Sequence, residues 1–352
     1  MRKTGLLLIM VFFFVFGINS LVGAQDVIKL KAANYLPPTH KMSLLSGWFC
    51  DEVKKRTNGK VEITYHAGGT LLSPDKMYVG VSTGIADMGL SHTGYTRGRF
   101  PVTEVLDLPL GFPSGYVASQ VSYDFYNQFK PSEWDAVHVL YFATTGPLII
   151  QTTSKPVKSL EELAGLKIRA TGQTADIVKS LGAVPVPLGM PDVYDSLRRG
   201  VIEGVMVDLS TLKYWKFAEV VKYVTSAWQI GSGYTFYWVM NKNKWDKMPP
   251  DVQKVLTEVG IEAKDKQAAL WNEMDIEGVQ AFKEKGGQMI SLPDAEAAKW
   301  VQKVEPVIAE YRKSMASKGF KEADVDGWIK FIKERIANWK AEEKKRGVAS
   351  PF

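Results

Sequence analysis

A short pattern occurs twice in this chain, at residues 77–87 (MYVGVSTGIAD) and again at residues 193–203 (VYDSLRRGVIE). Each copy contains a tyrosine, then a glycine (Gly84, Gly200), an apolar pair and an acidic residue, and each follows a proline, which suits the first turn of a helix. A helix that stops at a glycine and leads into a strand forms the second half of a βαβ unit. Two such copies predict two similar α/β lobes rather than one long sheet.

The residues before the first copy predict a strand, a helix and a second strand. Apolar and polar residues alternate at 28–32 and 61–65, which is typical of half-buried strands. Between them, apolar residues recur at helical spacing over 42–53, and Asn58-Gly59 is a good helix stop. The first lobe therefore opens as strand, helix, strand.

Two places along the chain favour crossings between the lobes. Residues 137–144 and 148–153 predict strands on either side of 145–147, where the chain can leave the first lobe. The aromatic and β-branched run at 234–240 is the expected return. We expect lobe I to cover residues 25–146 and 238–262, and lobe II with the C-terminal helices to cover residues 147–237 and 263–352.

The last hundred residues predict helices that buttress the two lobes. Helical patterning begins at Pro249-Pro250, and glycines at 286–287 and at 319 predict breaks between helices. Asp251 and Asp294 are the residue type that caps helix N-termini, so we expect both as N-caps.

The start of the chain has the order of a secretory signal peptide. Arg2 and Lys3 give a positive beginning, an apolar run covers 6–16, and small residues end at Ala24. We expect residues 1–24 to be removed, which would leave a soluble mature chain in a bacterial periplasm. An uncleaved anchor is the alternative, but about 20 apolar residues are needed to span a bilayer, and polar residues interrupt this run.

Composition excludes several classes of protein. The chain is 45% hydrophobic and 23% charged over 352 residues, which is typical of a globular protein with about two domains. Its single cysteine, Cys50, cannot form an internal disulfide, and its four histidines lack the His-x-x-x-His spacing of zinc sites. The net charge of +6 is spread thinly, without a basic face of the kind that binds nucleic acid. We therefore expect no cofactor, no metal and no nucleic-acid partner.

Residues 80–84 match the Gly-x-Ser-x-Gly motif, in which Ser82 would be the nucleophile of an exported hydrolase. That motif needs a strand entering the turn and a helix leaving it. Here a helical pattern enters and a strand pattern leaves, so the expected context is reversed. An exported hydrolase remains an alternative at this point, and loss of esterase turnover in Ser82→Ala would support it.

Arg169 is the strongest single candidate for a binding residue. Alternation over 166–169 predicts a strand whose carboxyl end holds this arginine, just before a turn and a helix. Ligands of open α/β sheets bind at such carboxyl ends, and a guanidinium offers a planar fork that matches a carboxylate. A solvated surface arginine is the alternative.

From Val27 to about Pro250 the chain resembles the solute-binding proteins of TRAP transporters, the DctP-type family that feeds organic acids to a sodium-coupled permease. The motifs that carry the resemblance are Pro37-Pro38-Thr39-His40, Gly84-Ile85-Ala86-Asp87-Met88, Val105-Leu106-Asp107-Leu108-Pro109, Leu163-Ala164-Gly165-Leu166-Lys167-Ile168-Arg169, Val193-Tyr194-Asp195-Ser196-Leu197, Gly200-Val201-Ile202-Glu203-Gly204 and Asn241-Lys242. The resemblance implies a two-lobed periplasmic binding protein fold with hinge-linked lobes, a membrane permease as partner and no enzymatic activity. It also implies that Arg169 holds the ligand's carboxylate.

The chain departs from the family pattern at two polar positions. The family often carries Gln-Glu-Asn-Pro where this chain has 205–208 (VMVD), and a second arginine used by some members is replaced within 147–150. Both departures remove polar contacts, which argues against a ligand with two carboxylates. We expect a monocarboxylate with an aromatic or apolar body, and a C4-dicarboxylate or another 2-oxo or 2-hydroxy acid is the alternative.

The expected ligand-binding residues combine this arginine with aromatic and neighbouring side chains: Arg169, Tyr35, His92, Tyr95, Met206, Asp208, Trp228, Tyr234 and Phe236. The expected assembly is a monomer that binds a small organic acid. Two further alternatives remain from the sequence: a binding protein of an ATP-driven importer, and a partner of a sensor ectodomain.

Overall fold

The computed structural model describes residues 27–351, whose strands form two sheets. The first sheet has the strand order β2-β1-β3-β10-β4. Strands β1 and β2 are parallel, as are β1 and β3, whereas β10 runs antiparallel to both β3 and β4. The bounds of its strands are β1 Ile28–Asn34, β2 Val61–His66, β3 Met88–His92, β4 Val137–Thr144 and β10 Thr235–Asn241.

The second sheet has the strand order β11-β9-β5-β8-β6-β7. Strand β6 is parallel to β7 and β8, whereas β5 is antiparallel to β8 and β9. The bounds of its strands are β5 Ile149–Thr152, β6 Lys167–Arg169, β7 Val184–Val186, β8 Gly204–Val207, β9 Tyr223–Ser226 and β11 Gln288–Ser291. Two sheets in place of one confirm the two-lobed α/β architecture.

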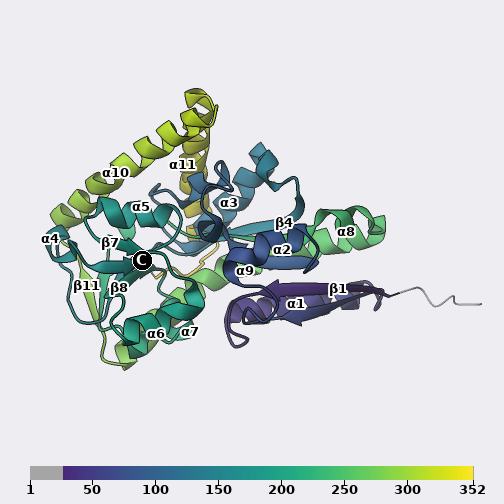
Figure 1. The fold of residues 1–352 in the computed structure, drawn as a ribbon, viewed down its shortest axis with the longest axis horizontal. Coiled ribbons are helices and arrows are strands. Elements are labelled where there is room, and N and C mark those ends of the chain that lie inside the picture. The colour runs from purple at the N-terminus through teal and green to yellow at the C-terminus, as the bar shows by residue number, and fades with distance from the viewer. Residues whose placement is uncertain (1–26, 352) are drawn as a thin grey trace, which may run out of the picture.

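The helices cover the sheets and connect the two lobes. Figure 1 shows α1, α2 and α8 on the side of the first sheet and α4 to α7 on the side of the second, with α10 and α11 along the upper edge. Helix α10 packs on α5 of the second lobe and α11 packs on α3 of the first, as expected of buttressing helices. The helix bounds are α1 Lys41–Arg56, α2 Met77–Ser82, α3 Gly115–Phe129, α4 Leu160–Leu163, α5 Gln173–Ser180, α6 Val193–Arg198, α7 Thr211–Tyr214, α8 Lys242–Asp246, α9 Pro250–Glu284, α10 Asp294–Ser317 and α11 Glu322–Lys345.

The repeated pattern forms the same structure in each lobe. Helix α2 leads through Gly84 (φ +85°) into β3, and α6 leads through Gly200 (φ +70°) into β8. The acidic residue that ends each copy accepts a hydrogen bond from the backbone N–H of a lysine on the neighbouring strand. Asp87 Oδ2 accepts from Lys31 N at 2.8 Å, and Glu203 Oε2 accepts from Lys167 N at 3.0 Å. The two copies are therefore equivalent in topology and in hydrogen bonding.

The chain crosses between the lobes at residues 145–148 and 227–234. Strand β10 lies wholly in the first sheet, so the return crossing ends at Thr235, a few residues before the expected boundary at 238. Helix α9 runs without a break past 262–263 and packs on α1 and α3 of the first lobe and on α7 of the second. Because α9 contacts both lobes, the assignment of its two halves stays a prediction.

The N-caps of α9 and α10 differ from the two that we expected. The N-caps of α9 and α10 are Pro249 and Pro293, while Asp251 and Asp294 lie within the first turn. A proline can precede a helix because it has no N–H to satisfy, and an aspartate within the first turn still complements the helix dipole.

The predicted signal peptide lies outside the described residues. Within residues 27–351, no helix has both the length and the apolar character to cross a membrane.

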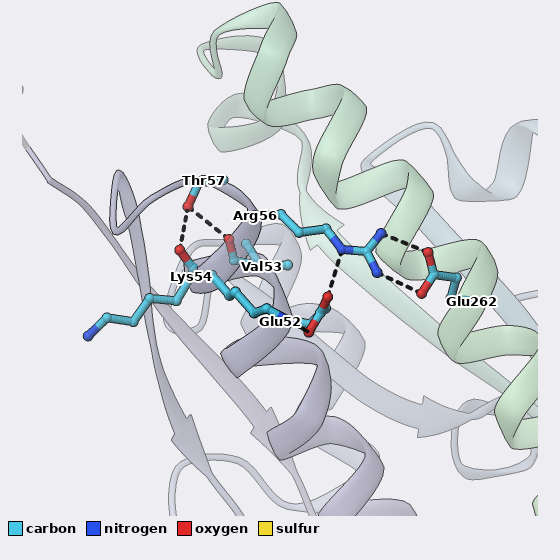
Figure 2. A network of polar contacts seen from close by, with 7 residues as sticks. Glu52, Val53, Lys54, Arg56, Thr57 and Glu262 are labelled. Atoms are coloured by element: carbon cyan, nitrogen blue, oxygen red, sulfur yellow. Dashed lines mark hydrogen bonds and ion pairs between the residues drawn. The ribbon is translucent and has the colours of Figure 1, made fainter.

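Polar contacts join the C-terminal end of α1 to α9 (Figure 2). Arg56 donates from Nη1 and Nη2 to the two carboxylate oxygens of Glu262 at 2.7 and 2.8 Å, and from Nε to Glu52 at 2.8 Å. Thr57 Oγ1 donates to the carbonyls of Val53 and Lys54, which also accept from the backbone N–H groups of Thr57 and Gly59. A bidentate arginine–carboxylate pair fixes geometry better than a single contact does.

Candidate ligand-binding site between the lobes

Arg169 is buried at the carboxyl end of β6, at 1% exposure. Its Nε and Nη2 donate to the carbonyl of Leu188 at 3.0 and 2.9 Å. Within residues 27–351, no carboxylate lies within ion-pair distance of this guanidinium. The alternative of a solvated surface arginine is therefore wrong. A buried cation without an anionic partner is expensive, and it points to an anionic ligand.

Residues from both lobes and from α9 surround a small cavity at Arg169. The first sheet contributes side chains at or just beyond the ends of β1, β3 and β10, and the second contributes the ends of β6 and β8. The space open to the centre of a water molecule is about 30 Å³, which is room for about two waters. The lining residues are Tyr35, Leu36, His40, His92, Tyr95, Thr145, Arg169, Met190, Val207, Asp208, Ser210, Thr211, Trp215, Tyr234, Phe236 and Trp271.

Aromatic rings, with both histidines counted, belong to eight of the sixteen residues that line the cavity. The ring of Tyr35 is nearly parallel to those of Trp215 and Phe236, at centroid distances of 6.5 and 6.4 Å. The ring of His92 lies 3.9 Å from that of Tyr95 and 4.7 Å from that of Tyr234. Such a wall provides apolar contact area and ring edges for a flat, apolar ligand.

Among the residues that line the cavity, Arg169 carries the permanent positive charge. Burial lowers the pKa of His40 to about 3. Burial, and then the charge of Arg169, lower the pKa of His92 well below its usual value. Both imidazoles are therefore neutral at pH 7. The guanidinium carbon of Arg169 lies 5.7 Å from the centre of the Tyr234 ring, within cation–π range.

The structure brings most of the expected binding residues together. Seven of them line the cavity: Arg169, Tyr35, His92, Tyr95, Asp208, Tyr234 and Phe236. Met206 is buried away from the cavity, because successive side chains of a strand point to opposite faces and its neighbour Val207 takes the cavity face. Trp228 lies in the short 3₁₀ helix 228–230, at 36% exposure and outside the lining. Contact of each lining residue with a ligand stays a prediction.

Several lining residues were not among the expected set. Trp271 lies on α9, where its spacing among apolar residues predicts only a core position. Its indole Nε1 is buried and, among the described residues, has no hydrogen-bond partner. His40 is the N-cap of α1 and accepts from Met42 N through Nδ1 at 3.1 Å. The one sequence signal for this loop was the Pro37-Pro38-Thr39-His40 motif, which is part of the family resemblance.

The hydrolase motif does not form a nucleophile elbow. Helix α2 enters the turn and β3 leaves it, and Ser82 Oγ donates to the carbonyl of Val79 at 3.0 Å within α2. Ser82 is not among the residues that line the cavity. Cys50 is buried in the core, and burial raises the pKa of its thiol to about 12.

Three polar contacts join the two lobes. The backbone N–H of Met190, in the second lobe, donates to the hydroxyl of Tyr95, in the first, at 3.2 Å. Gln173 at the start of α5 donates to Glu104 at 3.0 Å. Arg97 and Asp176 form an exposed ion pair across the same boundary. Of these residues, Met190 and Tyr95 also line the cavity at Arg169.

Comparison with known proteins agrees with this architecture. Residues 33–314 match the family described as bacterial extracellular solute-binding protein, family 7. The C4-dicarboxylate-binding protein of Bacillus subtilis is 25% identical over 302 residues, which are 82% of this chain and 83% of that protein.

Two solved structures extend the comparison. A TRAP periplasmic solute-binding protein from Desulfovibrio salexigens is 32% identical, with a TM-score of 0.77 over 93% of this chain and 99% of the other. A TRAP solute-binding protein from an unidentified marine microbe, specific for aromatic acid ligands and bound to 3-hydroxybenzoate, is 25% identical, with a TM-score of 0.82 over 89% and 98%. Relatives of this kind carry solutes and are not enzymes. The chain belongs to the bacterial extracellular solute-binding proteins of family 7, the binding proteins of TRAP transporters.

Proposed function

We propose that this protein captures an organic monocarboxylate with an aromatic body and delivers it to a TRAP membrane permease. The observation that carries the proposal is Arg169, a fully buried guanidinium that pairs with a carbonyl and lies in an aromatic cavity between two lobes. Its remaining N–H groups can form the two-point contact that a carboxylate prefers.

The charge of the cavity supports one carboxylate rather than two. Arg169 is its permanent cation, and the pKa values of His40 and His92 leave both imidazoles neutral at pH 7. Asp208 adds a carboxyl group to the same wall. A second ligand carboxylate would therefore be buried without a cationic partner, which is strongly unfavourable.

The walls of the cavity support an aromatic ligand body. Tyr35, Trp215 and Phe236 present ring surface, and Trp271 presents an indole N–H with no partner among the described residues. The marine relative that binds 3-hydroxybenzoate supports an aromatic acid, whereas the Bacillus subtilis relative supports a C4-dicarboxylate as the competing ligand. An aromatic acid is larger than the present cavity, so we propose that the lobes separate to admit it and close again by a hinge motion.

A thermal-shift and calorimetry screen tests the ligand class. Benzoate, 3-hydroxybenzoate and indole-3-acetate form one set, and succinate, malate and 2-oxoglutarate form the other. We expect saturable stabilisation by members of the aromatic set, because a ligand that binds only the folded state raises its stability. Stabilisation by the dicarboxylates alone would overturn the aromatic assignment while keeping the carboxylate assignment.

Export and assembly belong to the same proposal. We propose that residues 1–24 direct export and are removed, and that the mature chain works as a monomer. Intact mass of the protein recovered from a periplasmic extract tests the cleavage after Ala24. Light scattering coupled to size-exclusion chromatography tests the monomer, and a dimer mass would contradict it.

A further inference from the structure

Two buried carboxyl groups lie next to each other beside the cavity, and one of them, Asp208, lines it. Asp208 follows β8 and is 5% exposed, and Asp275 lies on α9 and is 0% exposed. The backbone N–H of Ser210 donates to Oδ1 of both, at 3.2 Å for Asp208 and 2.8 Å for Asp275. Because both oxygens lie within hydrogen-bond distance of one nitrogen, the two groups are close neighbours.

The surroundings of Asp275 favour a protonated carboxyl. Its Oδ2 is buried and has no hydrogen-bond partner among the described residues. That oxygen faces the backbone of Gly146, where an added Cβ would lie 2.0 Å from it. Burial, and then the charge of Asp208, raise the pKa of Asp275 well above its usual value. Two like charges this close in a buried site do not both ionise, so the pair holds one proton.

The shared proton makes the closed cavity electrically neutral. Arg169 contributes one positive charge, and the pair contributes one negative charge on Asp208, whose Oδ1 accepts from both the backbone N–H and the hydroxyl of Ser210. A carboxylate ligand that closes into this space adds a second negative charge. Burying that uncompensated charge is costly, and the cost disappears when a proton enters with the ligand.

We propose that the cleft takes up one proton together with its anionic ligand, and that Asp208 is the group that receives it. The ligand's carboxylate pairs with Arg169, and an O–H bond forms on Asp208 with a proton from the solvent. The species held in the closed cleft is the anion plus one proton. This inference rests on the proposed function and adds its proton linkage.

The other ionisable groups of the cavity do not replace Asp208 in this role. The cavity wall presents the phenols of Tyr35 and Tyr95, whose pKa values burial raises, together with the neutral imidazoles of His40 and His92. Burial raises the pKa of Asp208 and the charge of Arg169 lowers it, so the proton affinity of this carboxyl depends on whether Arg169 has another partner.

Charged groups on the elements packed around the pair are engaged elsewhere. Glu277 on α9 accepts from Lys41 and Lys213. Glu343 on α11 accepts from Ser114 and from Asn272, at 2.9 Å for the latter. Within the described residues, no group of three or more His, Cys, Asp or Glu side chains is placed to hold a metal ion. A proton is therefore the cation that this geometry favours.

Calorimetry in two buffers measures the proton directly. Benzoate is titrated into the protein at pH 7 in phosphate and in Tris, whose heats of ionisation differ, and succinate is titrated in the same way. We expect the enthalpy difference to correspond to uptake of about one proton, and the affinity to rise by up to about tenfold for each unit of pH decrease. Asp208→Asn keeps the shape of the side chain and should bind with no proton uptake and no pH dependence. Asp195→Asn, an exposed change of the same charge in the same lobe, should behave as the wild type.

Infrared spectroscopy of the protein without benzoate tests the pair independently of binding. We expect a protonated carboxyl band at pH 7 that Asp275→Asn removes in the difference spectrum. Absence of that difference, uptake of no proton, or unchanged proton uptake in Asp208→Asn would each overturn the inference. Tightening by Na⁺ or Ca²⁺ in the wild type but not in Asp208→Asn would identify a metal ion in place of the proton. If the band is present but neither benzoate nor succinate binds, the proposed function fails and the proton linkage fails with it.

Discussion

Gly172 and Gly94 touch across the boundary between the lobes, and a Cβ on Gly172 would lie 2.7 Å from the Cα of Gly94. Gly172 also has φ +58° and ψ −137°, a backbone conformation that residues other than glycine rarely adopt. We predict that Gly172→Ala keeps the lobes from closing fully and weakens benzoate binding at least tenfold. Calorimetry measures the affinity, and small-angle X-ray scattering should show a larger radius of gyration with benzoate than in the wild type.

Gly165→Ala is the matched control for that change. Gly165 has φ +77°, and a Cβ there would meet no atom within 4 Å. It should therefore lose about 1 kcal/mol of stability from backbone strain without loss of affinity. Equal affinities for the wild type and Gly172→Ala would show that this contact does not limit closure.

Arg169→Ala should abolish detectable ligand binding while the fold remains intact. Removing one partner of a buried charge pair costs about 2–5 kcal/mol, which is roughly a 30-fold to several-thousand-fold loss of affinity. Arg169→Lys keeps the charge but not the planar fork, so it should recover only part of the affinity. Arg199→Ala, an exposed change in the same lobe, is the control. Calorimetry with the best ligand of the screen decides the outcome, and wild-type affinity in Arg169→Ala would contradict the carboxylate assignment.

The sequence was sufficient to predict the repeat and the place of Arg169 at the end of a strand. The glycines at 84 and 200 stop helices of the same kind, and hydrophobic alternation placed Arg169 at the end of a strand. These features depend on local backbone preferences and on the face that a strand buries, and both are encoded over short windows.

Features that depend on packing between distant segments were not predictable. Val207 rather than Met206 faces the cavity. Side chains alternate along a strand, so a shift of one residue in register exchanges the side chains on its two faces. Trp271 looks like any core residue of α9 until the helix is placed behind the cavity. The pairing of Asp208 with Asp275 joins a strand end to a distant helix, and neither residue carries a local pattern that indicates it.

Glu277 holds three helices together at one point, and its removal should destabilise the protein. Its carboxylate accepts from Lys41 of α1 at 2.7 Å, from Lys213 of α7 at 2.9 Å and from Tyr214. Burial opposes its ionised form, but these hydrogen bonds outweigh burial and lower its pKa from 4.5 to about 2. The stabilisation is therefore complete above pH 4.5 and is lost as the pH falls toward 2.

We predict that Glu277→Gln lowers the free energy of unfolding by about 1–2 kcal/mol at pH 7, since charge-assisted hydrogen bonds of this kind are partly screened by solvent. The difference from the wild type should shrink between pH 4.5 and pH 2. Glu273→Gln is the control, because Glu273 also pairs with Lys41 but is 56% exposed. Urea unfolding at several pH values measures both, and equal losses in the two variants would contradict the role of Glu277.

His40 should make the protein sensitive to acid. Burial lowers its pKa from 6.5 to about 3, so the unfolded chain binds a proton between these values that the folded chain does not. The stability from this group is complete above about pH 6.5 and falls by up to about 1.4 kcal/mol per pH unit as the pH drops toward 3. His40→Asn keeps an N-cap acceptor for Met42 N. It should be less stable than the wild type at pH 7, because it loses its packing on Tyr214, yet lose less stability between pH 6.5 and 4. His66→Asn on β2 is the control, and parallel stability curves for the wild type and His40→Asn would show that His40 does not titrate on unfolding.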